Sequence, residues 1–209
     1  MNVLVVKANN RPATEGVSSK MYEVFMNEIG SDTNVETFDV FKEDMPYFGQ
    51  DFFEAMQKSA QAEPMSDLEQ RVLTASAKAM DAFMDADVVV FAFPLWNMTI
   101  PAALQTFIDY IYRAGMTFKY TENGPVGLVP EKKVIILNAR GGVYSTPEMA
   151  PAEMSVSYVR NIMNFFGIQD IKEVIIEGHA VAPDRAPEII AEGMERVKEA
   201  AQSLQGIKA

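Results

Sequence analysis

The 209-residue sequence contains no cysteine, and it has a single tryptophan, Trp96, and a single histidine, His179. Without cysteine the chain can form no disulfide, offer no thiolate nucleophile and bind no metal through cysteine, and this fits a reducing compartment. No apolar run approaches the roughly 20 residues that a membrane-spanning helix needs. Met1 leads directly into an apolar strand pattern without a basic signal segment. We therefore expect a cytoplasmic protein.

Several sequence motifs are also missing. The chain has neither the Gly-Lys-Ser/Thr of a P-loop nucleotidase nor the nucleophile elbow of a serine hydrolase. A receiver domain needs acidic residues after its first strand to hold a metal, and here residues 7–10 read Lys-Ala-Asn-Asn. Lysine and arginine number 18 against 29 acidic residues, a formal net charge of −11. This charge argues against a nucleic-acid or membrane partner, because phosphate-rich surfaces attract basic patches.

The most informative stretch is residues 87–112. Val88 to Phe93 is a continuous apolar run that ends at Pro94, a pattern typical of a strand buried on both faces of a parallel sheet. From Pro101 the apolar residues recur at helical spacing, which predicts a helix. The loop of residues 94–100 therefore lies at the carboxyl end of a parallel strand, where open α/β sheets bind their ligands.

The same strand and helix patterns alternate along the rest of the chain. They predict one α/β domain over residues 1–209, with a flavodoxin-like, doubly wound, five-stranded parallel sheet of order 2-1-3-4-5 and helices on both faces. The other predicted strands are 3–7, 34–40, 132–138 and 171–177, and the other predicted helices are 17–29, 67–86, 154–167 and 187–204.

Two segments are longer than the usual connections. The first is an insertion at about 41–66, in which we expect a helical piece over 51–61. We expect its aromatic cluster to pack onto the core, and the alternatives are that it lines a pocket or a subunit contact. The second is an excursion at about 113–128, whose turn residues predict a hairpin. The aromatic cluster consists of Tyr47, Phe48, Phe52 and Phe53.

Three loops follow three neighbouring strands of this sheet, at residues 8–19, 94–98 and 139–145. The first ends in Gly16 to Ser19, where helix N–H groups and hydroxyls can bind an anion. The second offers an aromatic ring and an amide, and the glycines at 141 and 142 let the backbone of the third approach a flat ring.

Each loop also has a purely structural interpretation. Ser18 would be a helix cap, which is the more common role of such a residue; Trp96 would be surface packing; and Gly141 with Gly142 would form a tight turn. Because the topology brings all three loops to one crevice, their combination favours a binding site for a flat, anionic, aromatic ligand.

At this point the sequence resembles a known family, the FMN-dependent NADH azoreductases (NADH:quinone oxidoreductases), which are flavodoxin-like flavoproteins. The similar segments are PLWNMTIPAALQTFIDYIYRAGMTFKYTENGPVGL and NARGGVYS, with VLVVKANNRP and the serine pair at 18 and 19. The resemblance covers essentially the whole chain. It implies FMN as cofactor, NADH or NADPH as cosubstrate, quinones and azo compounds as acceptors, and a homodimer with the active site at the interface.

The resemblance also implies a set of site residues. The FMN phosphate would bind at the start of the first helix, the loop after Phe93 would embrace the isoalloxazine, and the loop after Leu137 would hold its pyrimidine side with a flanking tyrosine. Phe118, Tyr120 and the insertion would cover the neighbouring subunit's site. The implied cofactor-binding residues are Asn10, Val17, Ser18, Ser19, Pro94, Leu95, Trp96, Asn97, Asn138, Ala139, Arg140, Gly141, Gly142 and Tyr144.

In such a protein the chemistry would belong to the cofactor. A nicotinamide would deliver hydride to flavin N5 and leave, and the acceptor would then receive two electrons, which is a ping-pong mechanism. No catalytic protein residue and no metal are expected, and Asn97 and Tyr144 are candidate orienting residues. Backbone N–H groups at Gly141 and Gly142 would face the flavin edge where negative charge develops. Apart from the resemblance, we interpret Arg140 as a solvated surface charge. We interpret His179 as a structural residue.

A flavodoxin-type one-electron carrier is the alternative function. It would also bind FMN, and the acidic surface would suit a basic protein partner. The insertion and the excursion argue against it, because this extra material is expected to build a dimer and a substrate pocket. Direct two-electron reduction by NAD(P)H would exclude the carrier.

Overall fold

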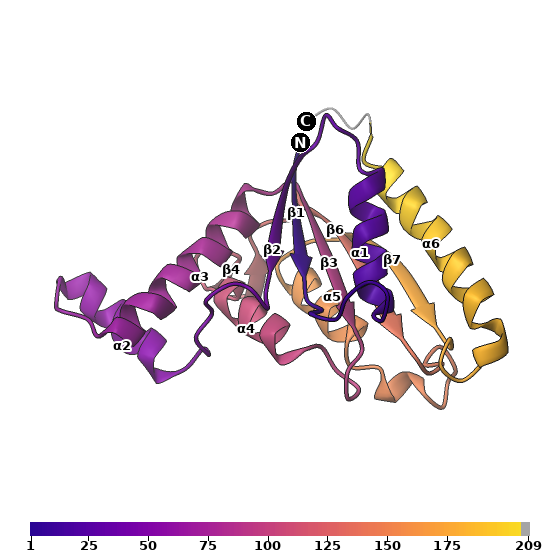
Figure 1. The fold of residues 1–209 in the computed structure, drawn as a ribbon. Helices are drawn as coiled ribbons and strands as arrows, with labels where there is room; N and C mark the ends of the chain where they lie inside the picture. Colours follow the sequence, from indigo (N-terminus) through magenta and orange to yellow (C-terminus); the bar gives the residue numbers. More distant parts are fainter. Residues whose placement is uncertain (206–209) are drawn as a thin grey trace.

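A computed structural model describes residues 1–205 and shows a five-stranded parallel sheet between two layers of helices (Figure 1). The strand order β2-β1-β3-β6-β7 confirms the predicted order 2-1-3-4-5. The last residues of the predicted domain, 206–209, lie outside the described residues. The strands of the sheet are β1 (Asn2–Lys7), β2 (Asn34–Asp39), β3 (Val88–Pro94), β6 (Lys133–Arg140) and β7 (Asp170–Glu177).

The side chains of the inner strands alternate between the two faces of the sheet. In β1, Val3 and Val5 belong to one apolar core, and the neighbouring Leu4 and Val6 belong to the other. Every residue of β3 is buried, because β3 pairs with β1 on one side and β6 on the other while helices cover both faces. This double burial explains the uninterrupted apolar run of β3 in the sequence.

Each core is closed by its own helices. The helices α1 and α6 pack against each other on one face (Figure 1), and α3, α4 and α5 cover the other. The predicted apolar stripe after Pro101 is confirmed, because Leu104, Phe107 and Ile108 are all buried. The helices are α1 (Val17–Glu28), α3 (Asp67–Asp85), α4 (Ala102–Ile111), α5 (Val156–Phe165) and α6 (Ala186–Gln202).

The insertion and the excursion both contain the elements expected of them. Within 41–66, α2 (Gln50–Gln61) packs against α3 and projects away from the sheet (Figure 1). The expected packing of its aromatic cluster holds for Phe52, which is buried, but is wrong for Tyr47 and Phe53, which are exposed. The excursion is an antiparallel hairpin, and short 3₁₀ helices η1 and η2 lie further along the chain. These elements are β4 (Phe118–Thr121), β5 (Gly124–Gly127), η1 (Ala150–Ala152) and η2 (Pro183–Arg185).

The helix expected over 154–167 is shorter at both ends. It begins at Val156, because the Glu153 carboxylate accepts hydrogen bonds from the first N–H groups of α5. It ends at Phe165, and Gly167 then adopts a left-handed conformation with φ +95°, the backbone that favours glycine after a helix. Along the described part of the chain, residues 1–205, no helix has both the length and the apolarity to cross a membrane.

Candidate functional site

The three loops singled out in the sequence meet at one cavity of about 230 Å³ at the carboxyl edge of the sheet. The cavity lies between the start of α1, the end of β3 and the end of β6. The strands β1, which leads to α1, β3 and β6 are neighbours in the sheet. A single residue from beyond the last strand, His179, completes the wall. The lining residues are Asn9, Arg11, Glu15, Gly16, Val17, Ser18, Pro94, Leu95, Trp96, Ala139, Gly141 and His179.

The first loop presents the N-terminus of α1 to this cavity. Among the described side chains none caps the helix: Ser18 Oγ accepts a hydrogen bond from Asn9 Nδ2 at 2.8 Å, and Ser19 Oγ donates to the Arg11 carbonyl at 2.7 Å. The interpretation of Ser18 as a helix cap is therefore wrong. The first N–H groups of a helix have no intrahelical partner and lie at the positive end of its dipole, so the cavity floor suits an anion.

The second loop is a tight turn after β3. Trp96 and Thr99 exchange two backbone hydrogen bonds of 3.0 and 3.1 Å. Between them Asn97 and Met98 both have positive φ angles, 50° and 69°. This backbone costs non-glycine residues on the order of 1–3 kcal/mol, and such strain gathers at functional sites. Trp96 is half-buried, and its ring centroid lies 6.2 Å from that of Phe41, so part of its contact is packing.

Trp96 also lines a second, larger space. A groove of about 880 Å³ runs between residues 40–48 and the start of α4, and it has Trp96, Asn97 and Phe48 among its lining residues. Asn97 is exposed and faces this groove rather than the smaller cavity. The two spaces therefore meet at the Trp96 side chain, with the anion-binding helix end on one side and a mostly apolar groove on the other.

The third loop begins inside the sheet. Asn138 is fully buried, and its Nδ2 donates to the Phe93 carbonyl at 3.1 Å, while its Oδ1 has no partner within residues 1–205. A Cβ at Gly141 would lie 2.9 Å from Ala180 Cβ, so a close approach between two loops requires glycine there. Of the two glycines, Gly141 lines the cavity and Gly142 does not.

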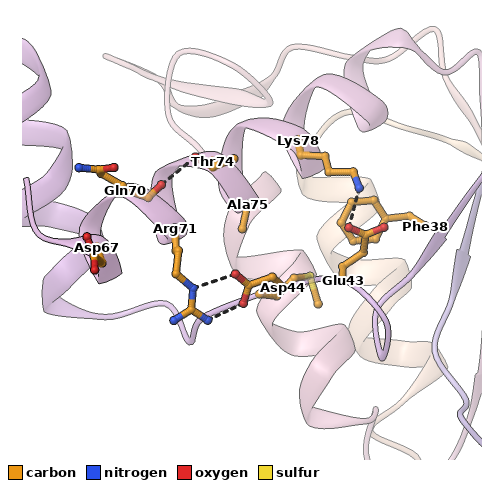
Figure 2. A pocket seen from close by; sticks show the side chains of 10 residues that line it. Phe38, Glu43, Asp44, Asp67, Gln70, Arg71, Thr74, Ala75 and Lys78 are labelled. Carbon is orange, nitrogen blue, oxygen red and sulfur yellow. Dashed lines mark hydrogen bonds and ion pairs between the residues drawn. The ribbon is translucent and has the colours of Figure 1, made fainter.

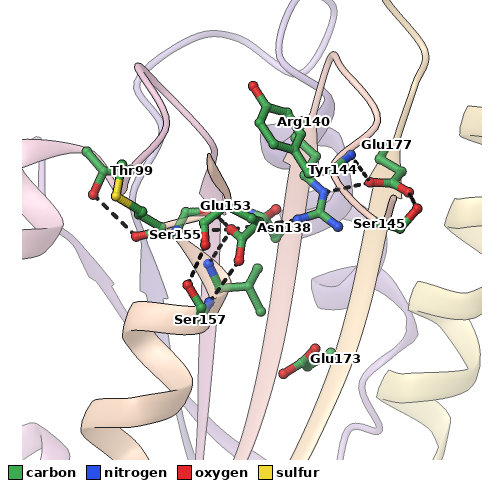
Figure 3. Close-up of polar contacts among 12 residues, drawn as sticks. Thr99, Asn138, Arg140, Tyr144, Ser145, Glu153, Ser155, Ser157, Glu173 and Glu177 are labelled. Atoms are coloured by element: carbon green, nitrogen blue, oxygen red, sulfur yellow. Dashed lines mark hydrogen bonds and ion pairs between the residues drawn. The ribbon is translucent and has the colours of Figure 1, made fainter. Parts of the chain in front are cut away.

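Arg140 differs most from expectation. It is 6% exposed, and its guanidinium points inward, where its Nε donates to Glu177 Oε2 at 3.0 Å (Figure 3). The interpretation as a solvated surface charge is therefore wrong. The physical reason is the sheet register: Arg140 at the end of β6 lies directly beside Glu177 at the end of β7, and a buried cation requires such a partner.

Some predicted residues lie away from the cavity. Asn10 is exposed and does not line it, whereas its neighbour Asn9 is buried and does. On the hairpin, Phe118 is buried against the rings of Tyr112 and Phe165, and only Tyr120, 73% exposed, is available to a second molecule.

Sequence reasoning missed His179, Asn9, Arg11 and Glu15 as lining residues. Nδ1 of His179 is buried and lacks a hydrogen-bond partner in the described part of the chain, and burial lowers the pKa of the ring. The imidazole is therefore neutral at pH 7 and can accept or donate one hydrogen bond. Its position directly after the fifth strand was a usable signal, because the same argument identified the other three loops.

Another cavity, of about 550 Å³, lies between residues 43–45 and α3 (Figure 2). Four of its charged groups are paired with one another: Arg71 makes two hydrogen bonds to the Asp44 carboxylate, and Lys78 Nζ lies 2.5 Å from Glu43 Oε2. None of the predicted site residues lines it. We interpret this cavity as part of the contact between the insertion and α3.

Comparison with known proteins places the chain among close relatives. A family model described as flavodoxin-like fold matches residues 1–201. The FMN-dependent NADH:quinone oxidoreductase 1 of Bacillus subtilis (strain 168) is 47% identical over 202 residues, covering 95% of this chain and 97% of the relative. The FMN-dependent NADH:quinone oxidoreductase 4 of Bacillus cereus (strain ATCC 10987 / NRS 248) is 48% identical over 205 residues, covering 97% and 99%.

Solved structures agree with this placement. The crystal structure of an azoreductase from Bacillus anthracis str. Sterne superposes with a TM-score of 0.89 at 47% identity, covering 97% of this chain and 99% of the other. An FMN-dependent NADH-azoreductase from Bacillus anthracis str. Ames Ancestor, solved in complex with FMN, superposes with a TM-score of 0.86 at 27% identity, covering 97% and 98%.

Proposed function

Because the chain belongs to the family with the flavodoxin-like fold, we propose that it is an FMN-dependent NADH:quinone oxidoreductase that also reduces azo compounds. The observation that carries the proposal is the meeting of three loops at one cavity in a chain 47–48% identical, over nearly its full length, to oxidoreductases of that name. The activity resides in a single FMN-binding domain, residues 1–209, with NADH or NADPH as the electron donor.

The residues present fit FMN on several counts. The start of α1 offers N–H groups and the Ser18 hydroxyl, and the exposed Arg11, whose Nη2 lies 3.6 Å from Glu15 Oε2, adds a cation at the rim, so this part suits the phosphate. Two buried polar atoms have no partner in residues 1–205: Nδ1 of His179, a residue that lines the cavity, and Oδ1 of Asn138, which directly precedes the lining residue Ala139. The cavity alone is smaller than the roughly 300–1,000 Å³ of typical ligand pockets, and the groove beyond Trp96 supplies the remaining room.

We assign the site residues accordingly. The phosphate binds at Val17, Ser18 and Ser19, with Asn9 and Arg11 in place of Asn10. The turn after β3 would hold the isoalloxazine, and the loop after β6 would hold its pyrimidine side. The residues assigned to the ring are Pro94, Leu95, Trp96, Asn97, Asn138, Ala139, Gly141, Gly142 and Tyr144.

FMN held by these residues would supply the redox chemistry, the transfer of two electrons from a nicotinamide donor to the acceptor. The protein's part is positional. The strained turn at Asn97 fixes the edge of the groove, and the half-buried Trp96 excludes water from its floor. Backbone N–H groups of Gly141 and Gly142 stabilise negative charge at the pyrimidine edge. No side chain has to move a proton in the hydride step.

The groove is the natural place for the substrates. It is bounded by Phe41, Tyr47, Phe48 and Trp96, whose rings suit flat molecules such as nicotinamides, quinones and azo dyes. Because one groove serves donor and acceptor, the two bind in turn, which gives ping-pong kinetics. We further propose a homodimer with the site at the interface, supported by the exposed aromatic side chains of Tyr47, Phe53 and Tyr120.

Steady-state kinetics test this proposal. NADH oxidation by the FMN-loaded protein, measured at several fixed concentrations of a benzoquinone, should give parallel double-reciprocal lines. Converging lines would mean that donor and acceptor bind together, and the single-groove proposal would be wrong. No turnover with either NADH or NADPH would favour the one-electron carrier instead.

A further inference from the structure

Arg140 occupies a buried junction at the carboxyl edge of the sheet. Its Nε donates to Glu177 Oε2 at 3.0 Å, and its Nη1 lies 3.6 Å from Glu153 Oε1 (Figure 3). The three side chains are 6%, 20% and 10% exposed. Charges at this depth persist only when they are paired and hydrogen-bonded. The arrangement therefore holds the ends of β6, β7 and α5 at fixed positions.

The Glu177 carboxylate holds more than the arginine. Its Oε2 also accepts the backbone N–H of Tyr144 at 2.9 Å, and its Oε1 accepts the hydroxyl of Ser145 (Figure 3). The Arg140 guanidinium lies 5.6 Å from the centroid of the Tyr144 ring, within cation–π range. One carboxylate thus fixes both the strand end and the turn of the third loop.

Backbone contacts join the same two loops between these points. Gly178 N donates to the Gly142 carbonyl at 3.1 Å, and Ala180 N donates to the Gly141 carbonyl at 3.0 Å. Residues from both loops, Gly141 and His179, line the cavity. The position of this cavity wall therefore depends on the link between residues 140–145 and residues 177–180.

Glu153 extends the network to the second loop. Its carboxylate accepts the N–H groups of Ser155, Val156 and Ser157 at 2.8–3.0 Å, which anchors the start of α5. The adjacent Met154 donates its N–H to the Met98 carbonyl at 3.0 Å. Arg140 thus lies between two carboxylates. Glu177 holds the third loop, and Glu153 lies next to Met154, which holds the turn after Trp96.

We propose that Arg140, Glu177 and Glu153 form a positioning network that sets the separation of the two loops on either side of the flavin ring, and thereby the affinity for FMN and its midpoint potential. This inference rests on the proposed function. The three are positioning residues, because they contact one another, the start of α5 and the 144–145 turn, and none of them lines the cavity. The network carries a net charge of −1, so removing a carboxylate charge should make reduction of nearby FMN more favourable.

The chain offers a matched control on the same strand. Glu173 of β7 also pairs with an arginine, since Arg160 Nε lies 2.5 Å from Glu173 Oε1, and the side chains of Glu173 and Glu177 are 23% and 20% exposed. The Arg160–Glu173 pair joins α5 to β7 and touches neither loop of the site. Glu177→Gln and Glu173→Gln therefore each remove one carboxylate charge from an arginine pair, but only the first lies at the cavity wall.

The experiment compares these two variants with the unchanged protein by FMN titration and by spectroelectrochemical measurement of the midpoint potential. We expect Glu177→Gln to weaken FMN binding roughly tenfold or more, since it removes the charge from several hydrogen bonds, and to shift the potential to more positive values. Glu173→Gln should leave the FMN affinity within twofold of the unchanged protein and the midpoint potential within experimental error. Should Glu177→Gln fail to fold, Ser145→Ala, which removes one donor to Glu177 from an exposed residue, should weaken binding by a smaller factor.

Two results would overturn the inference. The first is equal FMN affinity in Glu177→Gln and the unchanged protein. The second is weaker affinity with an unchanged midpoint potential, which would mean that Glu177 only supports the fold. If the unchanged protein binds no FMN, the proposed function fails and the inference fails with it. If the unchanged protein and Glu177→Gln both bind FMN equally well, the network is refuted but the proposed function is not.

Discussion

Replacement of Gly141 by alanine should weaken FMN binding through a clash between two loops. The new Cβ would lie 2.9 Å from Ala180 Cβ, closer than side-chain carbon atoms approach in folded proteins. The backbone hydrogen bond from Ala180 N to the Gly141 carbonyl, 3.0 Å long, prevents the loops from separating freely. Overpacking of this kind costs about 1–3 kcal/mol. Since about 1.4 kcal/mol corresponds to a tenfold change, FMN affinity should fall roughly five- to a hundredfold.

The assay is a titration of apoprotein with FMN, followed by flavin fluorescence, with thermal unfolding of each apoprotein measured alongside. The double variant Gly141→Ala/Ala180→Gly removes the methyl group that causes the clash, so it should recover most of the lost affinity. Gly141→Ala binding FMN as tightly as the unchanged protein would refute the reasoning. So would a double variant no better than the single one, because the loss would then not arise from the Ala180 contact.

Three further predictions follow from single contacts. Ser18→Ala removes the hydroxyl assigned to the phosphate, which Asn9 Nδ2 holds in place at 2.8 Å, so FMN binding should weaken by about 1–3 kcal/mol while riboflavin, which lacks the phosphate, binds nearly unchanged in the same titration. Lys132→Met removes a buried ammonium that donates to the Met84 and Ala86 carbonyls at the end of α3; urea unfolding should show a loss of about 1–3 kcal/mol with no change in FMN affinity. Finally, although burial raises the pKa of Glu177, hydrogen bonds from Ser145 and Tyr144 and the nearby Arg140 lower it more, to a net value below the usual 4.5. The unfolded chain then binds the proton more readily, so this group's contribution to stability is present above about pH 4.5 and is lost as the pH falls through the folded-state pKa; urea unfolding of Glu177→Gln should show a weaker acid dependence, and an identical one would contradict this assignment.

The fold was predictable because its signals are local. The apolar run of β3, Pro94 after it and the helical spacing from Pro101 are all read within 26 consecutive residues, and the structure places strand, turn and helix there. The alternation of such units then leaves few topologies for a parallel sheet, since crossover connections are right-handed and strand ends share one edge. The meeting of the three loops follows from that topology alone.

The details of the site depend on contacts between distant residues, which no local pattern encodes. The inward turn of Arg140 requires its register partner Glu177, 37 positions away. Ser18 appeared to be a helix cap because hydroxyl residues near helix starts usually are, and its actual partner, Asn9, is known only once the loop is folded. The choice of Asn9 over Asn10 for the cavity wall has the same origin, because only the folded loop shows which amide is buried.

The proposed function rests on one reaction, the two-electron reduction of bound FMN by NADH followed by reoxidation by a quinone. The most direct test is an anaerobic titration of the FMN-loaded protein with NADH, followed by visible absorbance, with a benzoquinone added at the end. The account predicts that one equivalent of NADH bleaches the flavin in a single two-electron phase and that the quinone restores the oxidised spectrum. Failure of both NADH and NADPH to bleach the flavin, or chemical reduction in two separate one-electron steps, would contradict it and identify a carrier.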